Sequence, residues 1–125
     1  MDLSADEARL MLATLACSSD GQCDKDEEAI IRRRLAPHLA RLGAAGEERT
    51  FVRLYHTIGT KGQEVVLKAI RKALPRLEDR VDALRTTIEI VKSDGSLTSE
   101  EMDHIAEVAD ELGLSEAQLR AAMAP

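Results

Sequence analysis

An eight-residue pattern that occurs twice constrains the fold of this chain more than any other sequence feature. Residues 20–27 and residues 94–101 both read Asp-Gly-x-apolar-cap-x-x-Glu, where the cap is a side chain that commonly starts a helix. Each copy is followed four residues later by an isoleucine, Ile31 or Ile105, and stands between two helix-forming runs. Two matching helix-turn-helix units predict an all-α fold with two pseudo-symmetric repeats.

Apolar spacing and capping residues predict a compact bundle of about seven helices in the 125-residue chain. The predicted helical ranges are 5–17, 25–36, 47–58, 61–74, 77–93, 99–112 and 116–123, with a short turn at 39–43. The apolar residues of 77–93 recur at spacings of three and four, so we expect this helix to be the central one. No strand and no long linker is predicted, and residues 1–125 are expected to form a single domain.

Capping boxes predict where five of these helices begin. The paired residues are Ser4 with Glu7, Asp24 with Glu27, Thr60 with Gln63, Thr98 with Glu101, and Ser115 with Gln118. Gly59 and Gly113 are the predicted ends of two helices, because glycine commonly follows the last helical residue.

Aliphatic side chains supply nearly all of the apolar content, which is 44% of the chain. Phe51 and Tyr55 are the only aromatic residues, so the chain lacks the stacking platform of proteins that bind single-stranded nucleic acid. No apolar run reaches the roughly 18 residues of a bilayer-crossing helix, and the acidic N-terminus is unlike a secretory signal. Two cysteines make no disulfide framework. We therefore expect a soluble cytoplasmic protein.

Charge is unevenly distributed along the chain, whose net charge is −6. Residues 1–30 hold 8 acidic and 2 basic side chains, residues 31–92 hold 7 acidic and 14 basic, and residues 93–125 hold 8 acidic and 1 basic. If the repeat is also a spatial one, the two acidic segments meet and the basic middle lies elsewhere. The fold would then carry opposed acidic and basic faces, although solvated helix surfaces explain the same pattern.

The two turns share the second half of a calcium-binding EF-hand loop, which has an acidic residue, then Gly, and a Glu at its last position. The first half is absent, because Ala16 and Ile90 stand where that loop requires its first Asp. A complete EF-hand is therefore not expected. The hard oxygen donors at both turns would still suit Ca²⁺ or Mg²⁺ better than a soft ion. The candidate ligands are Asp20, Asp24, Asp26, Glu27, Asp94, Glu100 and Glu101.

The same residues have a purely structural interpretation. Asp20 and Asp94 can accept hydrogen bonds from their own turn backbones. Glu27 and Glu101 can complete capping boxes and favour the positive ends of their helices. Under this interpretation the turns bind no ligand, and the residues alone leave both interpretations open.

The duplicated turn between helices resembles the TerB-like tellurite-resistance family over nearly the whole chain, from Leu10 to Met123. The resemblance implies a compact helical bundle with internal pseudo-two-fold symmetry and separate positive and negative surface clusters. It also implies a non-enzymatic role in tellurite resistance or the general stress response, through metal sensing or partner recruitment near the membrane. The family's acidic signature falls on Asp20, Asp24, Glu27, Asp94 and Glu101.

The chain departs from the family pattern at two positions. Cys23 occupies an apolar position, and Thr98 stands where the first repeat has Asp24. The second turn is therefore poorer in ligands. We expect the first turn to be the better candidate for an ion, rather than a symmetric pair of sites.

Cysteine and histidine residues carry weaker signals. Cys17 and Cys23 align with apolar residues of the second repeat, which predicts buried, unreactive thiols. His104 aligns with Ile30, which favours a half-buried packing role over metal ligation. No nucleophile, phosphate loop or acid–base pair has a recognisable motif, so we expect no enzymatic activity.

Arginine and lysine dominate the middle of the chain. The predicted basic group is Arg32, Arg33, Arg34, Arg41, Arg49, Arg53, Lys68, Arg71, Lys72 and Arg76. A solvated surface is the simplest interpretation, and docking to an acidic protein or an anionic lipid surface is the alternative. Nucleic-acid binding is not expected, because the pI is about 5.1 and aromatic residues are scarce.

These observations predict a binding module associated with stress and tellurite resistance that binds or senses a divalent metal ion at its paired acidic turns. The alternative is a metal-free protein–protein adaptor that uses opposed acidic and basic faces. Other stress-response proteins are the expected partners, and peripheral membrane association is a further expectation. The sequence leaves the oligomeric state open.

Overall fold

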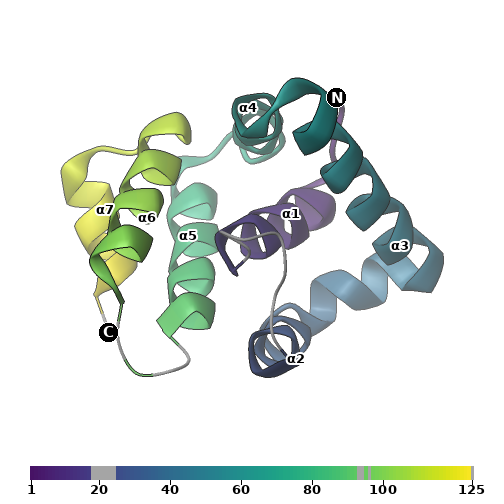
Figure 1. The fold of residues 1–125 in the computed structure, drawn as a ribbon, viewed down its shortest axis with the longest axis horizontal. Coiled ribbons are helices and arrows are strands. Elements are labelled where there is room, and N and C mark those ends of the chain that lie inside the picture. The colour runs from purple at the N-terminus through teal and green to yellow at the C-terminus, as the bar shows by residue number, and fades with distance from the viewer. Residues whose placement is uncertain (18–24, 93–94, 96, 125) are drawn as a thin grey trace.

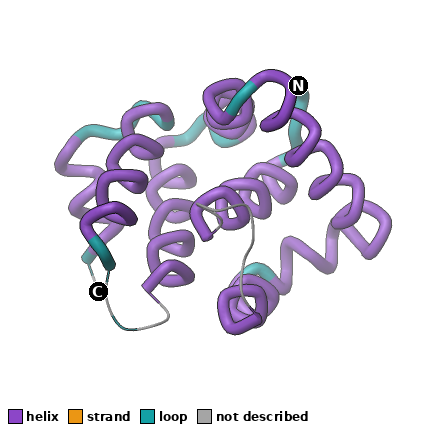
Figure 2. Tube along the Cα trace, viewed as in Figure 1, coloured by secondary structure: helices purple, strands orange, loops and turns teal. Residues whose placement is uncertain are grey.

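Seven helices make up the part of the chain that the computed structural model describes, which is residues 1–17, 25–92, 95 and 97–124 (Figure 1). They are α1 (Ala5–Cys17), α2 (Lys25–Arg34), α3 (Ala36–Lys61), α4 (Gln63–Ala73), α5 (Leu77–Val91), α6 (Ser99–Glu111) and α7 (Glu116–Met123). No strand occurs within these residues (Figure 2). The predicted all-α class and the predicted number of helices are confirmed.

The central helix is α1, which contacts α2, α3, α4 and α5 and lies between α3 and α5 in Figure 1. The prediction that residues 77–93 form the central helix is wrong. The apolar stripe of α5 covers only one side of that helix, and Leu77 at its start is 46% exposed. From Ala8 to Ala16, by contrast, every residue of α1 except Arg9 is buried. A helix that is apolar on nearly all sides belongs in the middle of a bundle.

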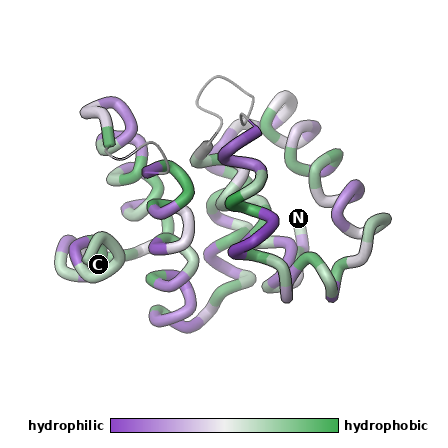
Figure 3. The backbone as a smooth tube through the Cα atoms, turned by 90° about the horizontal axis from the view of Figure 1, so that it is seen from below, coloured by the Kyte–Doolittle hydropathy of each residue, from purple (hydrophilic) through white to green (hydrophobic). Residues whose placement is uncertain are grey.

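The core consists of two clusters of aliphatic side chains. The larger cluster gathers residues of every helix except α2, among them Met11, Ile70, Leu84 and Ile105. The smaller cluster joins α1, α2 and α5, and half-buried Phe51 of α3 packs against it. Figure 3 shows the hydrophobic and hydrophilic segments that alternate along the helices, as expected for helices with one buried face.

Three of the predicted capping boxes are present with both of their reciprocal hydrogen bonds. They join Ser4 with Glu7, Thr98 with Glu101, and Ser115 with Gln118. The predicted box of Asp24 with Glu27 includes a residue outside the described ranges. The predicted box of Thr60 with Gln63 is wrong, because Thr60 lies inside α3 and its hydroxyl donates to the carbonyl of His56 at 2.8 Å.

Two glycines set the shape of α3, and neither is the one predicted. Gly59 was expected to end this helix, but α3 continues through it to Lys61. The helix ends at Gly62, whose φ of 87° lies in the left-handed region that glycine tolerates best. Gly43, with φ 70° and ψ 170°, interrupts α3 near its start and kinks it. The predicted short turn at 39–43 is therefore the first segment of α3, before the kink.

The two pseudo-symmetric repeats stay a prediction, because most of the first turn and part of the second lie outside the described residues. Within the described residues, no helix is long and apolar enough to cross a membrane.

Candidate functional site at the acidic turns and α6

The structure describes two of the five residues of the predicted acidic signature. Glu27 lies in the first turn of α2 and is half-buried, and Glu101 lies in the first turn of α6 and is also half-buried. Asp20, Asp24 and Asp94 lie outside the described residues, as does Cys23. Whether these five carboxylates converge therefore stays a prediction.

The second turn shows how its backbone prepares the start of α6. Gly95 has a φ of 110°, and its N–H donates to the carbonyl of Lys92 at 2.8 Å. Thr98 then caps α6: its hydroxyl accepts the N–H of Glu101 at 3.1 Å, and Glu101 Oε1 accepts the N–H of Thr98 at 2.9 Å. The predicted capping role of Glu101 is thus confirmed. Only one of its carboxylate oxygens is used in the box.

A continuous acidic face on α6 was not anticipated from the sequence. Glu100, Asp103, Glu107 and Asp110 are spaced three, four and three residues apart, so they share one side of the helix, and all four are exposed. None of them forms an ion pair within the described part of the chain. The spacing itself was the available signal, since residues three and four apart lie next to each other on a helix.

The predicted basic group divides into paired and unpaired side chains. Arg32, Arg34, Arg41 and Arg53 form ion pairs, with Glu47, Glu89, Asp6 and Glu7 respectively. Among the described residues, Arg33, Arg49, Lys68 and Arg71 form none. The unpaired cations lie on α2, α3 and α4, and the unpaired anions described above lie on α6. Unpaired anions also occur on these three helices, at Asp26, Glu48 and Glu64, whereas α6 contains no Lys or Arg. Among these four helices, α6 alone carries formal charge of a single sign.

A polar cluster joins the first turn of α1 to α3. Asp6 Oδ1 lies 2.7 Å from His38 Nδ1, and both oxygens of Asp6 accept hydrogen bonds from Arg41 at 3.0–3.2 Å. The hydrogen bond from Arg41 lowers the pKa of Asp6 below its usual 3.8; burial opposes this shift and His38 adds to it. Glu7 accepts a second bridge at 2.8 Å from Arg53. Sequence reasoning missed this cluster because its members are more than thirty residues apart.

His104 is half-buried on α6, as predicted, and its Nε2 atom is buried without a hydrogen-bond partner among the described residues. No group of three His, Cys, Asp or Glu side chains within the described ranges is placed to hold a metal ion. Three of the five predicted ligands fall outside these ranges, so the predicted metal site is untested.

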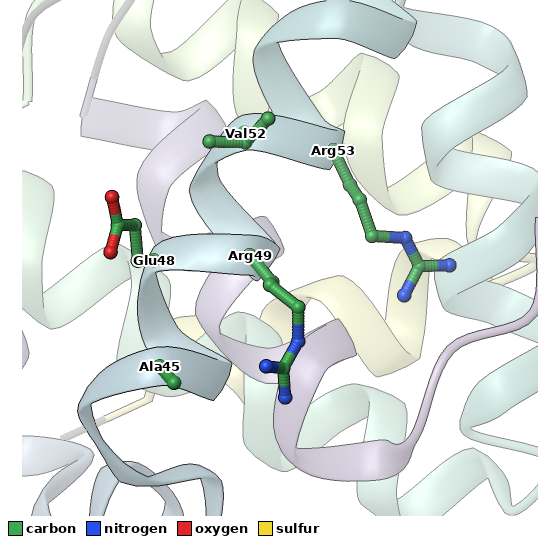
Figure 4. Close-up of a pocket in the computed structure, with 5 residues that line it drawn as sticks. All are labelled: Ala45, Glu48, Arg49, Val52 and Arg53. Atoms are coloured by element: carbon green, nitrogen blue, oxygen red, sulfur yellow. The ribbon is translucent and has the colours of Figure 1, made fainter.

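Two shallow depressions lie along the outer side of α3. One has a volume of about 440 Å³ and is lined by Ala45, Glu48, Arg49, Val52 and Arg53 (Figure 4). The other has a volume of about 490 Å³ and is lined by Arg32, Ala44, Glu47, Glu48, Phe51, Val52 and Tyr55. Glu48 and Val52 border both.

Comparison with known proteins gives one match. The family model described as tellurite resistance protein TerB matches residues 9–124, which is nearly the whole chain. No curated protein and no solved structure gives a significant match.

Proposed function

The chain belongs to the TerB tellurite-resistance family, and on that basis we propose that it is a non-enzymatic, cytoplasmic binding module of the tellurite and general stress response. We place its ligand, a divalent cation, at the paired acidic turns. The proposed ligands are Asp20, Asp24, Glu27, Asp94 and Glu101.

The acidic face of α6 is the observation that carries this proposal. It directly follows the second turn, and its four exposed carboxylates are not neutralised by any described residue. Uncompensated carboxylates raise the local concentration of cations. Their hard oxygen atoms favour Ca²⁺ or Mg²⁺. The capping bond of Glu101 uses Oε1, and no described residue donates a hydrogen bond to its Oε2 atom.

Thermal unfolding in the presence of ions tests the cation site. The pure protein is melted at constant ionic strength with increasing Ca²⁺, Mg²⁺, Zn²⁺ or tellurite. A ligand that binds only the folded state stabilises it by RT ln(1 + [L]/Kd), which is about 2.7 kcal/mol at a hundredfold excess over Kd. We expect a saturable rise in melting temperature with Ca²⁺ or Mg²⁺. The absence of a rise at millimolar concentrations would remove the cation from the proposal.

Substitutions locate the site. Asp20→Asn and Asp94→Asn should each reduce the ion-dependent rise, because each removes a charged oxygen donor. Asp103→Asn is the matched control on the acidic face of α6. It should leave the ion-dependent rise in melting temperature unchanged if the ion binds at the turns. A response that survives both turn substitutions would place the cation elsewhere.

The unpaired carboxylates of α6 and the unpaired cations of α4 favour a second candidate, a metal-free adaptor. Its acidic surface would be α6, and its basic surface would include Lys68 and Arg71 on α4, both exposed. Other stress-response proteins or an anionic membrane surface would then be the partners. Binding of this kind should persist in EDTA, weaken with salt and be lost in Glu107→Lys, measured by pull-down. Partner capture that requires a divalent ion would instead support the cation site.

A further inference from the structure

The outer face of α3 exposes apolar side chains that no described element covers. Val52 is 62% exposed and Tyr55 is 48% exposed, and half-buried Phe51 lies beside them. Phe51 and Tyr55 are the two aromatic residues of the chain. Val52 and Tyr55 are two of the four large hydrophobic side chains that are exposed among the described residues. Depressions on either side of Val52 give this face a ridge between two grooves. Helices pack by fitting such ridges into the grooves of another helix.

The two sides of this ridge differ in chemistry. Successive helical residues are about 100° apart around the axis, so Glu48 and Tyr55 fall on one side of Val52 and Arg49 and Arg53 on the other. Figure 4 shows the Glu48 carboxylate on one side of the helix and both guanidinium groups on the other. Glu48 borders both grooves, but its carboxylate lies on the Tyr55 side, where Arg32 is already paired with Glu47. We therefore call the groove on the Tyr55 side the acidic groove, and the groove that contains Arg49 and Arg53 the basic groove.

Positive and negative charges on this face are nearly balanced. Arg32 is paired with Glu47 at 2.8 Å, and Arg53 is paired with Glu7 at 2.8 Å. Glu48 and Arg49 are left as one anion and one cation without ion-pair partners among the described residues. An acidic peptide or an anionic membrane would meet no excess of positive charge here. A surface that carries both complementary halves fits a second copy of itself.

We propose that the outer face of α3 is the interface of a homodimer. A two-fold axis running nearly along α3 sets the two helices side by side and places the acidic groove of each copy against the basic groove of the other. Glu48 then meets Arg49 of the second copy, and the reciprocal pair forms on the other side of the axis. Val52 lies at the centre against its counterpart, and Tyr55 lies within reach of a guanidinium group.

The dimer should be weak. One helix face buries less than the roughly 1,200 Å² of total surface that stable interfaces reach. Sedimentation equilibrium of the full chain over roughly 10 µM to 1 mM therefore suits the measurement. EDTA keeps the result independent of the proposed cation site, and a reducing agent keeps Cys17 and Cys23 from cross-linking copies. We expect a reversible monomer–dimer equilibrium.

Charge exchange gives the decisive test. Glu48→Arg and Arg49→Glu should each weaken the dimer at least about tenfold, because each turns two attractive pairs into two repulsive ones. The double variant Glu48→Arg, Arg49→Glu should recover most of the loss, since both reciprocal pairs return with exchanged partners. Val52→Glu should weaken the dimer without recovery. All three positions are exposed, and circular dichroism confirms that each variant is folded.

Glu107→Arg on α6 is the matched control for charge, and it should leave the dimer unchanged. The proposal fails if the wild-type chain stays monomeric throughout, or if the double variant associates no better than the single ones. A monomer that sediments with phosphatidylserine-rich vesicles through Arg49 would assign this face to a membrane, and a monomer that binds another helical protein through Val52 would assign it to that partner. Either result also overturns the homodimer.

Discussion

Asp6 connects two helices through a single carboxylate. It lies in the first turn of α1, and His38 and Arg41 reach it from the first turns of α3. The side chains of Asp6 and His38 are only 20% and 22% exposed, so this is a partly shielded junction rather than a loose surface pair. Partial burial makes such interactions stronger than those between fully exposed charges.

The lowered pKa of Asp6 predicts how this junction responds to acid. A carboxylate with a depressed folded-state pKa adds stability that is fully present above its unfolded pKa of about 3.9 and is lost as the pH falls through the folded value. Asp6→Asn should therefore reduce the free energy of unfolding at neutral pH. The difference in free energy of unfolding between Asp6→Asn and the wild type should shrink in acid, as the pH falls below 3.8, the usual pKa of this carboxyl.

Urea unfolding of both proteins between neutral pH and about pH 3 measures this difference. Asp103→Asn serves as control, because Asp103 has no ion pair among the described residues, and its difference from wild type should stay small at every pH. A gap between Asp6→Asn and wild type that stays constant into acid would show that Asp6 contributes through packing and not through its charge.

At the scale of the helices, the sequence predicted starts more reliably than ends. The capping boxes at Ser4, Thr98 and Ser115 were readable because each needs only two residues at a fixed spacing. The end of α3 was not readable, because Gly59 and Gly62 are equally permissive residues three positions apart. Hydrogen bonds from Gly62 N–H to the carbonyls of Thr57 and Ile58 decide between them, and those depend on where the packed helix turns toward α4.

Alanine substitution of two glycines in α3 should have opposite effects on stability. Gly43 has φ 70° and ψ 170°, a region essentially restricted to glycine, so Gly43→Ala should cost about 1–3 kcal/mol. Gly59 lies within the regular helix, and a Cβ there would meet open space. Gly59→Ala should therefore stabilise the protein by about 0.5–1 kcal/mol. Chemical denaturation measures the free energy of unfolding of both variants. If both substitutions changed it in the same direction, this description of the kink would be refuted.

In the candidate site, too, the features that depend on neighbouring residues can be predicted from the sequence, and those that depend on packing between distant segments cannot. The acidic face of α6 was not predicted, although the spacing of its four carboxylates was a sufficient local signal, since helical neighbours are three and four residues apart. The contacts of Asp6 with His38 and Arg41 had no such local signal, because only the packing of α1 on α3 brings them together. The central position of α1 was missed for a related reason. Its short, continuous apolar run has less visible periodicity than the stripe of α5, although it is buried on more sides.

At the scale of the described molecule, α6 stands out because it carries carboxylates without a single Lys or Arg, and this bears on any titration with cations. A divalent ion can stabilise the protein in two ways: by binding a specific site at the turns, or by screening the like charges of α6. Carboxylates three and four residues apart on one helix repel one another by about 0.2–0.5 kcal/mol per pair. Those near the C-terminus of α6 also oppose its dipole, and its last turn has no basic residue.

Neutralising the end of this face should therefore stabilise the chain. The double variant Glu107→Gln, Asp110→Asn should raise the melting temperature at low ionic strength, and the gain should fade as salt increases, because screening already relieves the repulsion in the wild type. Glu100→Gln is the control within the same helix: it lies in the first turn, where a negative charge favours the dipole, and it should bring no gain. Thermal unfolding at several salt concentrations, followed by a Ca²⁺ titration at fixed ionic strength, separates the two effects of cations. If Ca²⁺ still raises the melting temperature of the double variant, the ion binds at the turns. If the Ca²⁺-dependent rise in melting temperature is lost in the double variant, Ca²⁺ only screened the charges of α6.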